Sequence, residues 1–289
     1  MVDENDSGPV TVAFQGEPGA FSQDAARKLL GPRATTLPCR KFDEMFEAVT
    51  SGRADTAIAP IENSLAGSVH QNYDLMMDHQ LTIVGEIYLK IVLNLIASPG
   101  ATLESVRNVS SHPVALAQCE RFFRTHPTME SKPAYDTAGS VKMVLESGSL
   151  DWAAIAGRPA ATVYGGRILA ESIQDNDANF TRFLLLARAG HPVPLPVSPG
   201  TARKTSIVFR VANRPSALFR ALAVFALRDI DLTKIESRPI EGRPWEYSFY
   251  LDLGGDAADP KVSRAIDHLS ETAESVRVLG SYPSGGSWE

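Results

Sequence analysis

The fold of this chain follows from a strand–turn–helix unit close to its start, Val10-Thr11-Val12-Ala13-Phe14-Gln15-Gly16-Glu17-Pro18-Gly19-Ala20-Phe21-Ser22. Apolar residues 10–14 predict a short strand, and residues 18–30 predict a helix that follows the glycine-containing turn. Such a turn offers backbone N–H groups to an anion, because the first helical turn has no internal partners for them. The turn matches neither the dinucleotide-binding pattern nor the P-loop, so nucleotide binding is not indicated.

The same alternation of strand and helix continues along the chain. Further strands are predicted at residues 56–60, 106–110, 153–156 and 183–187, and further helices at 42–50, 67–77, 113–123, 137–146 and 159–164. This alternation predicts an α/β fold of parallel sheets with helices on both faces. Residues 81–97, rich in Ile, Val and Leu, are expected to form one long extended segment that passes between two sheets. The prediction is therefore two lobes with a cleft between them.

A proline-rich linker, residues 191–203, is expected to separate this region from a second domain. Residues 191–200 hold four prolines and end in glycine, a composition that favours a stiff, extended spacer. Residues 204–283 then show the ferredoxin-like order βαββαβ. The expected organisation is a disordered start at 1–8, a two-lobed domain at 9–190, the linker, the ferredoxin-like domain and a flexible tail at 284–289.

Composition excludes several classes of protein. The 289 residues are 44% hydrophobic and 21% charged, as in ordinary globular proteins, and the net charge of −6 argues against a nucleic-acid partner. The apolar stretch 83–97 is broken by Glu86, Lys90 and Asn94, so no membrane span is expected. The acidic start does not resemble a secretory signal, and we expect a cytoplasmic protein. Cys39 and Cys119 are predicted to be two separate buried thiols.

Polar side chains follow several predicted strands, where α/β proteins usually place ligands. The candidates for binding a substrate are Gly19, Ala20 and Ser22 in the first turn, Glu62, Asn63 and Ser64 after the strand at 56–60, and Ser111 and Thr137 before two helices. Plain helix-capping turns are the alternative at each of these places. No metal site is expected, because no His, Cys and Asp cluster has metal-ligand spacing.

The run Asn179-Phe180-Thr181-Arg182-Phe183 lies where a polar segment enters an apolar strand. Its hydroxyl and guanidinium suit an enzyme that must hold a carboxylate and protonate a leaving oxygen. The alternative is a Thr-Arg pair that only satisfies the backbone of a turn. His112, just before Pro113, is either a general acid or a helix cap, of which the cap is the commoner role.

A second group of polar residues, Glu236-Ser237-Arg238-Pro239, ends a predicted strand of the C-terminal domain. A Glu beside an Arg can bind both charged ends of an amino acid, the carboxylate through the fork of the guanidinium. A solvated strand end with a salt bridge is the alternative reading.

Taken together, these runs resemble the ordered motifs of the prephenate dehydratases. The resemblance rests on residues 16–22, 60–69, 111–119 and 179–183, and residues 205–283 look like the ACT domain fused to these enzymes. It implies a two-lobed catalytic domain similar to periplasmic binding proteins, with the active site between the lobes. It also implies decarboxylative dehydration of prephenate to phenylpyruvate, on the path to phenylalanine, without a cofactor.

The resemblance also implies roles for single residues. Thr181 would donate a hydrogen bond to the departing hydroxyl, Arg182 would fix a substrate carboxylate or orient the loop, and Phe183 would pack beneath it. Because threonine is a very weak acid, Thr181 is expected to stabilise the developing negative oxygen without ionising fully.

In the ACT domain, the resemblance implies a site for L-phenylalanine as an allosteric effector. Its expected residues are Ser216, Ala217, Leu218 and the run Glu236-Ser237-Arg238-Pro239. Ser216 stands where the usual motif has glycine. This difference is expected to change the affinity for the L-phenylalanine effector. A homodimer or homotetramer is implied as well.

Some stretches are more similar to the plant arogenate dehydratases, namely residues 68–75, 173–175 and 279–283. L-Arogenate, which carries an amine where prephenate has a keto oxygen, is therefore the alternative substrate. Two other classes remain: a non-catalytic solute-binding protein, which can share the lobed fold, and a purely regulatory amino-acid sensor.

Overall fold

The computed structural model describes residues 8–191, 193, 195–196, 198 and 200–285. The predicted disordered start lies outside the described residues except for Gly8, as do residues 286–289 of the predicted tail and four positions of the predicted linker. The chain divides into two compact units, Met1–His79 with Ile87–Phe183, and Gln80–Glu86 with Leu184–Glu289.

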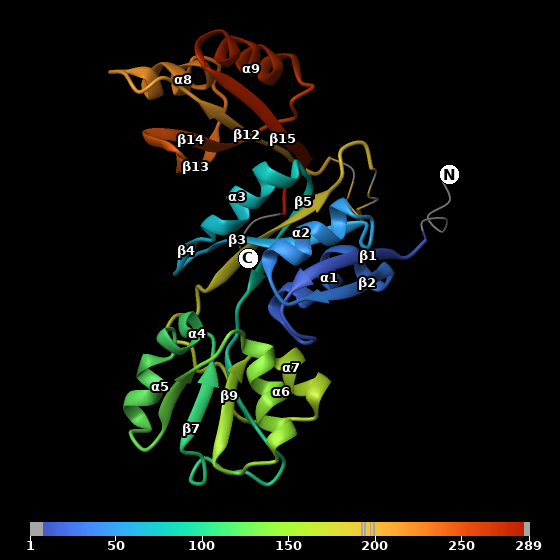
Figure 1. Cartoon of the computed structure of the whole chain (residues 1–289), viewed down its shortest axis with the longest axis vertical. Helices are drawn as coiled ribbons and strands as arrows, with labels where there is room; N and C mark the ends of the chain where they lie inside the picture. The colour runs from blue at the N-terminus through green and yellow to red at the C-terminus, as the bar shows by residue number, and fades with distance from the viewer. Residues whose placement is uncertain (1–7, 192, 194, 197, 199, 286–289) are drawn as a thin grey trace. The chain divides into compact units, whose positions relative to one another are not determined.

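The first lobe is built on a sheet with the strand order β2-β1-β3-β11-β5, to which β4 adds by pairing with β3 (Figure 1). Its strands are β1 (Val10–Gln15), β2 (Ala34–Cys39), β3 (Thr56–Asn63), β4 (Gly67–Ser68), β5 (Thr82–Lys90) and β11 (Phe180–Ala187). Its helices are α1 (Phe21–Leu30), α2 (Phe42–Thr50) and α3 (His70–His79), with a short 3-10 turn, η1 (Gly31–Arg33), after α1. The start of β3 is buried on successive residues, as in a strand that is covered on both faces.

The second lobe has the sheet order β10-β6-β9-β7-β8. Its strands are β6 (Asn94–Ala97), β7 (Asn108–Ser111), β8 (Glu130–Pro133), β9 (Trp152–Ala156) and β10 (Arg167–Ala170). Its helices are α4 (Pro113–Ala117), α5 (Glu120–Thr125), α6 (Thr137–Ser147) and α7 (Arg158–Tyr164). The predicted passage of residues 81–97 between two sheets is confirmed, because β5 belongs to the first sheet and β6 to the second.

The C-terminal domain is a four-stranded antiparallel sheet, β13-β14-β12-β15, with α8 and α9 packed on one face. Its elements are β12 (Arg203–Arg210), α8 (Ala217–Ala226), β13 (Leu232–Ile240), β14 (Arg243–Gly254), α9 (Pro260–Thr272) and β15 (Ser275–Pro283). Phe209, Phe225 and Leu269 are among the buried residues that join the two helices to the sheet. The predicted βαββαβ order is present.

Several local predictions were wrong. The sheets of the two lobes are mixed: β4 pairs antiparallel with β3 in the first lobe, and β6 pairs antiparallel with both β9 and β10 in the second. The predicted helix at 113–123 is two short helices separated at Gln118 and Cys119, and the helix expected at 67–77 begins only at His70. The strands β2, β8 and β10 were not predicted; each lies at the edge of its sheet, where few residues are buried.

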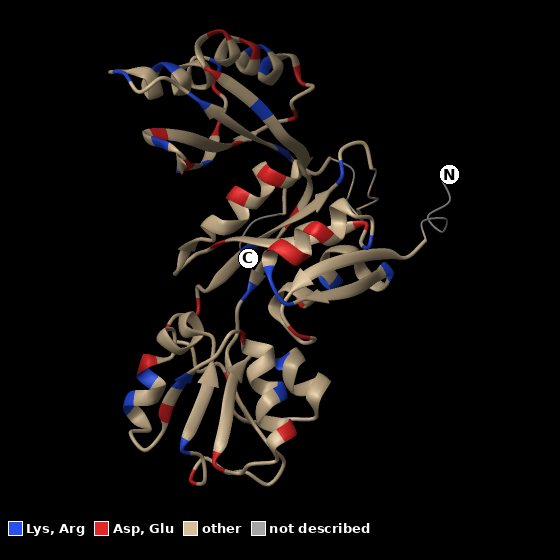
Figure 2. Ribbon diagram, viewed as in Figure 1, with Lys and Arg blue, Asp and Glu red and all other residues tan. Residues whose placement is uncertain are grey.

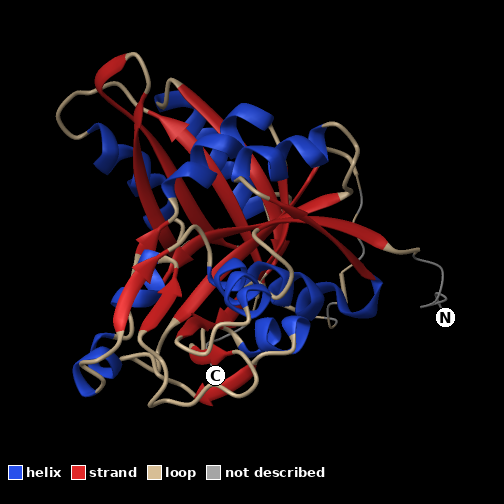
Figure 3. Ribbon diagram, turned by 60° about the horizontal axis from the view of Figure 1, so that its bottom comes forward, coloured by secondary structure: helices blue, strands red, loops and turns tan. Residues whose placement is uncertain are grey.

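The interior and the surface are those of an ordinary α/β protein. Figure 3 shows that the ribbon contains both strands and helices, and Figure 2 shows acidic and basic residues interspersed along it. Cys39 and Cys119 are free and buried, as predicted, and burial raises the pKa of the Cys39 thiol to about 11. No helix in the described part of the chain is long and apolar enough to cross a membrane.

Candidate active site

A cavity of about 700 Å³ lies within the first compact unit. Its walls come from both lobes: the ends of β1 and β3, the starts of α1 and α2, the turn at β4, the starts of α4 and α6, and the first residues of β11. A small organic molecule would fit a space of this size. The cavity is therefore the candidate site for a substrate.

Three helices of at least nine residues begin at this cavity. The lining includes Phe21 in the first turn of α1, Phe42 in the first turn of α2 and Thr137 in the first turn of α6. The first N–H groups of a helix have no internal partner and carry the positive end of the helix dipole. Arg40 and Lys41, also in the lining, add two basic side chains, and Asp43 and Asp136 add two acidic ones. The helix N-termini and the basic side chains can therefore bind negative groups of a ligand.

Thr181 presents its hydroxyl to the cavity from the start of β11. Alternate residues of a strand point to the same face, and both Thr181 and Phe183 line the cavity. Asn63 Nδ2 donates a hydrogen bond of 3.0 Å to Thr181 Oγ1. The threonine oxygen therefore acts as an acceptor, and among the described residues none accepts a hydrogen bond from its proton. This leaves the Thr181 proton for a group bound in the cavity.

Three amide side chains fix the position of this hydroxyl. Asn63 Nδ2 also donates to Asn179 Oδ1 at 2.8 Å, and Asn179 Nδ2 donates to Gln118 Oε1 at 2.9 Å. Gln118 Nε2 in turn donates to Asn63 Oδ1 at 3.3 Å, which closes the ring of amides. Because Gln118 belongs to the second lobe and Asn63 to the first, the network depends on both lobes. Buried amide networks of this kind restrict side chains to one arrangement.

Arg182 does not line the cavity. It follows Thr181 on the strand, so its side chain points to the opposite face of the sheet, where it is 5% exposed. Its guanidinium carbon lies 5.9 Å from the centre of the Tyr88 ring, a cation–π contact. Of the two roles expected for Arg182, this placement fits the positioning of the strand and does not fit contact with a carboxylate in the cavity.

The other predicted substrate-binding residues divide into two groups. Asn63, Ala20, Ser22, Thr137 and Phe183 line the cavity, together with Thr181. Gly19, Glu62, Ser64 and Ser111 do not.

Structural contacts account for the second group. Ser111 is fully buried, and its hydroxyl donates to the Ile155 carbonyl at 2.6 Å. Ser64 Oγ donates to the Ala178 carbonyl at 2.9 Å, and Glu62 pairs with Ser68 in the β3–β4 hairpin. At Gly19, a Cβ atom would lie 2.6 Å from the Cα atom of Ala160, so the glycine permits close packing.

Asp136 and Tyr135, which precede α6, were not predicted to belong to the site. Asp136 is the N-cap of α6 and lines the cavity beside Tyr135 and His112. Burial raises the pKa of Asp136, and the hydrogen bond from the Gly139 N–H opposes this shift. The loss of solvent around the imidazole lowers the pKa of His112, although Asp136 opposes that shift. His112 Nδ1 accepts a hydrogen bond from the Val114 N–H at 3.3 Å, so the helix-cap role is present.

The residues predicted to bind an effector lie on different parts of the C-terminal domain. Ser216 precedes α8 in the left-handed conformation, with φ 65°, and Ala217 and Leu218 are the first residues of that helix. Beyond the bulge in β13, Ser237 pairs with Phe249, a residue on the helix-covered face.

The neighbours of Ser237 lie on the other face of the sheet. Glu236 and Arg238 pair with Tyr250 and Ser248 there, whereas Pro239 pairs with Tyr247 on the face of Ser237. Glu236 Oε2 also lies 3.7 Å from Lys234 Nζ. Of the run Glu236-Ser237-Arg238-Pro239, Ser237 and Pro239 therefore share the face on which α8 packs.

No group of three or more His, Cys, Asp and Glu side chains in the described residues is arranged to hold a metal ion. The lining itself offers amides, hydroxyls, helix N-termini and two basic side chains. These groups can bind anions and donate hydrogen bonds, and Asp136 can accept them.

The fold and the site together define a two-lobed α/β enzyme with an anion-binding cavity, joined to a ferredoxin-like domain. The prephenate dehydratase family model matches residues 12–191, and the ACT domain model matches residues 205–269. The chain belongs to the prephenate dehydratase family and carries a C-terminal ACT domain.

Three similar proteins illustrate the relationship. Arogenate dehydratase/prephenate dehydratase 2 of Arabidopsis thaliana, a chloroplastic protein, is 47% identical over 285 residues, which are 95% of this chain and 73% of the relative. The crystal structure of prephenate dehydratase in complex with L-Phe from Arthrobacter aurescens has a TM-score of 0.85 and 35% identity, covering 96% of this chain and 90% of the other. GqqA, described as a novel type of quorum quenching acylase, has a TM-score of 0.86 and 38% identity, covering 95% and 98%.

Proposed function

We propose that this enzyme converts prephenate to phenylpyruvate with Thr181 as the hydrogen-bond donor to the departing hydroxyl. The observation that carries this role is the hydrogen bond from Asn63 to Thr181 Oγ1, which leaves the threonine proton for the substrate. The carbon–oxygen bond breaks, and the departing hydroxide, stabilised by the hydrogen bond from Thr181, takes up a proton from solvent and becomes water. The bond to the ring carboxylate breaks as well, and its electron pair completes the aromatic ring as CO2 departs.

The chain's contribution to this reaction is positioning and charge stabilisation. The aromatic product supplies the driving force, so the protein needs to orient the substrate and stabilise the leaving oxygen. The starts of α1, α2 and α6, with Arg40 and Lys41, are the groups we assign to the two carboxylates. Phe183, which is 2% exposed, forms an apolar part of the wall.

Turnover assays test the proposal. Purified protein is incubated with prephenate, and phenylpyruvate is followed by its absorbance in alkali; a parallel reaction with L-arogenate is followed by the phenylalanine that forms. We expect turnover of at least one substrate well above the acid-catalysed background. No turnover of either would overturn the proposed activity and favour a protein that only binds its ligand.

We also infer that L-phenylalanine regulates the enzyme through the ACT domain. An L-Phe complex is known for the similar protein of Arthrobacter aurescens, which supports the choice of effector. Arg238 is the residue we assign to the effector carboxylate. We expect Arg238→Ala to shift inhibition to concentrations at least about tenfold higher. An unchanged inhibition curve would show that the effector binds elsewhere.

We also propose that the protein forms a homodimer or homotetramer and that it is located in the cytoplasm. A homo-oligomer would allow ACT domains to pair at the regulatory site, and sedimentation equilibrium would give its mass.

A further inference from the structure

Asp136 holds a carboxylate oxygen in the cavity wall that the fold does not use. Its Oδ1 atom accepts a hydrogen bond from the Gly139 N–H and so caps α6. The second oxygen, Oδ2, is buried and has no hydrogen-bond partner among the described residues. The whole residue is only 8% exposed. A buried carboxylate oxygen without a partner is unfavourable, so this arrangement suits a ligand that supplies one.

The neighbouring protein groups are engaged elsewhere. The Tyr135 hydroxyl donates to Glu17 Oε1 at 3.0 Å, and the Lys142 ammonium lies 3.1 Å from Glu17 Oε2. The Tyr135 hydroxyl and the Glu17 N–H are near enough to lower the pKa of Asp136, but neither makes a hydrogen bond to Oδ2. His112 accepts at Nδ1 from a backbone N–H, and its lowered pKa favours the neutral ring near neutral pH. None of the side chains of Tyr135, Lys142 and His112 therefore neutralises Asp136.

A small space lies beside the unused oxygen. Gly16, which also lines the cavity, faces Asp136, and a Cβ atom on Gly16 would lie 3.6 Å from Oδ2. The backbone of Gly16 has φ +114°, which favours glycine at this position. A Cβ atom on Gly16 would also lie 3.3 Å from the Cβ atom of Ala20, so the missing side chain leaves room for a group no larger than a methyl. An ammonium group has a similar size, carries a positive charge and donates three hydrogen bonds.

We propose that Asp136 binds the α-ammonium group of an amino-acid substrate and so makes L-arogenate the preferred substrate of this cavity. The inference rests on the proposed function, because it assigns a specificity residue to the same reaction. L-Arogenate carries an ammonium group where prephenate has a keto oxygen. The ammonium would pair with Oδ2, whereas a keto oxygen would place one acceptor against another. The carboxylate next to the ammonium would lie at the helix N-termini.

The substitution Asp136→Asn tests this role, because asparagine keeps the shape and the cap of α6 but removes the charge. We expect kcat/KM for L-arogenate to fall by about 10- to 100-fold, the effect of losing a hydrogen bond to a charged group. For prephenate we expect a change of less than about threefold, or a gain. Asp136→Ser, which also caps a helix, should show the same selective loss, and its melting temperature shows whether the fold is intact.

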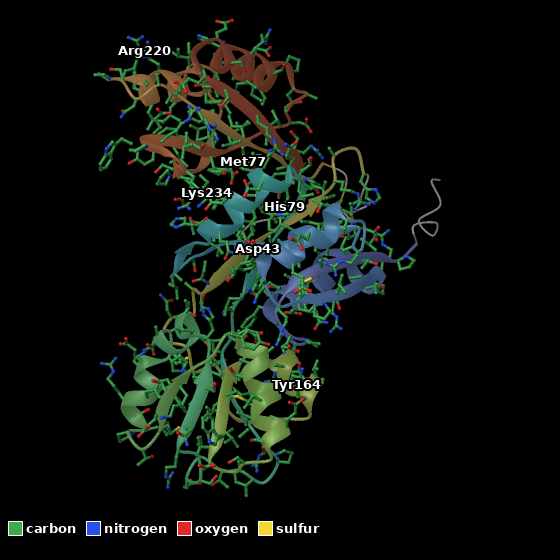
Figure 4. All side chains as sticks on the ribbon, viewed as in Figure 1. Asp43, Met77, His79, Tyr164, Arg220 and Lys234 are labelled. Atoms are coloured by element: carbon green, nitrogen blue, oxygen red, sulfur yellow. The ribbon has the colours of Figure 1, made fainter. Side chains whose placement is uncertain are left out.

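Asp43→Asn is the matched control. Asp43, labelled in Figure 4, is an exposed carboxylate of the same cavity whose Oδ2 accepts a hydrogen bond from Gln71 at 3.2 Å. We expect this change to affect both substrates by the same factor.

The outcomes separate the two proposals. Equal losses for both substrates in Asp136→Asn, or no loss for L-arogenate, would overturn the specificity role while the dehydratase activity stands. Turnover of prephenate but not of L-arogenate by the unmodified enzyme would do the same. Turnover of neither substrate would overturn the proposed function and this inference with it.

Discussion

The Thr181 hydroxyl depends on residues that are far away in the sequence. Its hydrogen-bond partner Asn63 is 118 positions away, and Gln118 reaches Asn63 across 55 positions. A threonine alone would be free to rotate its hydroxyl. The Asn63 amide donates to Thr181 Oγ1 and so limits the directions in which the threonine proton can point. The Thr181 hydroxyl is thereby oriented as a hydrogen-bond donor.

Ser216 adopts a left-handed backbone conformation, which is unfavourable for a residue with a Cβ atom. It is exposed, has φ 65° and makes no capping hydrogen bond through its side chain. We expect Ser216→Gly to raise the free energy of unfolding of the domain by about 1 kcal/mol, because the left-handed conformation is costly for residues with a Cβ atom. Thermal denaturation followed by circular dichroism measures this change.

Ser216→Ala provides the control, since alanine keeps the Cβ atom and removes only the hydroxyl. It should leave the melting temperature close to that of the unmodified protein. Equal melting temperatures for the glycine and alanine variants would contradict a backbone effect at Ser216.

Part of the site was predictable from single residues. Thr181 and Asn63 lie at strand ends, where polar side chains indicate a ligand, and both line the cavity. Arg182 was expected beside Thr181, but the alternation of side chains along β11 places it on the other face. Asp136 received no role, because nothing in its local sequence shows that Oδ2 lacks a partner. That fact depends on residues brought together by the fold.

At the level of elements, the turn between β1 and α1 holds the two lobes of the first compact unit in close contact. Gly19 has φ +90°, and its Cα approaches Ala160 in α7 so closely that a side chain would not fit. The adjoining residues Ala20 and Ser22 line the cavity. The shape of this turn therefore affects both packing and the anion-binding end of α1.

We expect Gly19→Ala to destabilise the protein by about 2–4 kcal/mol, since backbone strain and overpacking add. Gly52→Ala is the matched control, because Gly52 has a similar φ of +81° but nothing within 4 Å of the position that a Cβ atom would take. It should cost only the strain, about 1–2 kcal/mol. Urea denaturation compares the two, and equal costs would show that the contact with Ala160 is unimportant.

Elements with a strong pattern were predicted best. The amphipathic spacing in residues 42–50 predicted a helix with the bounds observed for α2, Phe42–Thr50. The edge strands β2 and β8 were missed because their residues are mostly exposed or half-buried and show no apolar alternation. The division between α4 and α5 was missed because the apolar residues continue through it, while the Gln118 side chain there bonds to Asn63.

At the scale of the whole molecule, the second compact unit contains a buried ion pair that joins β5 to β12. Lys204 Nζ lies 2.8 Å from Glu86 Oε1, and the Glu86 side chain is completely buried. The Gly285 N–H donates to the same oxygen at 2.9 Å. Glu86 therefore ties the start of the ACT domain and a residue just beyond its last strand to residues 80–86.

We expect Lys204→Met to lower the free energy of unfolding by about 3 kcal/mol, because it removes one partner of a buried ion pair. Lys132→Met is the control, since Lys132 and Glu130 form an exposed pair at 2.7 Å, and its loss should cost less than about 1 kcal/mol. Calorimetry would compare the variants. Equal effects would mean that the buried pair contributes no more than a surface pair.

The sequence was sufficient to predict the architecture but not all strand directions. Alternating strands and helices predicted two α/β lobes, and the βαββαβ order predicted the ferredoxin-like domain; both are present. The antiparallel pairs of β6 could not be predicted, because they arise where the chain crosses from one sheet to the other and enters in the opposite direction.

The most direct test of the account is the turnover number of Thr181→Val compared with Thr181→Ser. Valine keeps the shape of the side chain and removes the hydroxyl, whereas serine keeps the hydroxyl. We predict that kcat falls by about 100-fold or more in Thr181→Val with a modest change in KM, and that Thr181→Ser retains most of the activity. A Thr181→Val enzyme with nearly unchanged kcat would contradict the account and transfer the donor role to another group, His112 first.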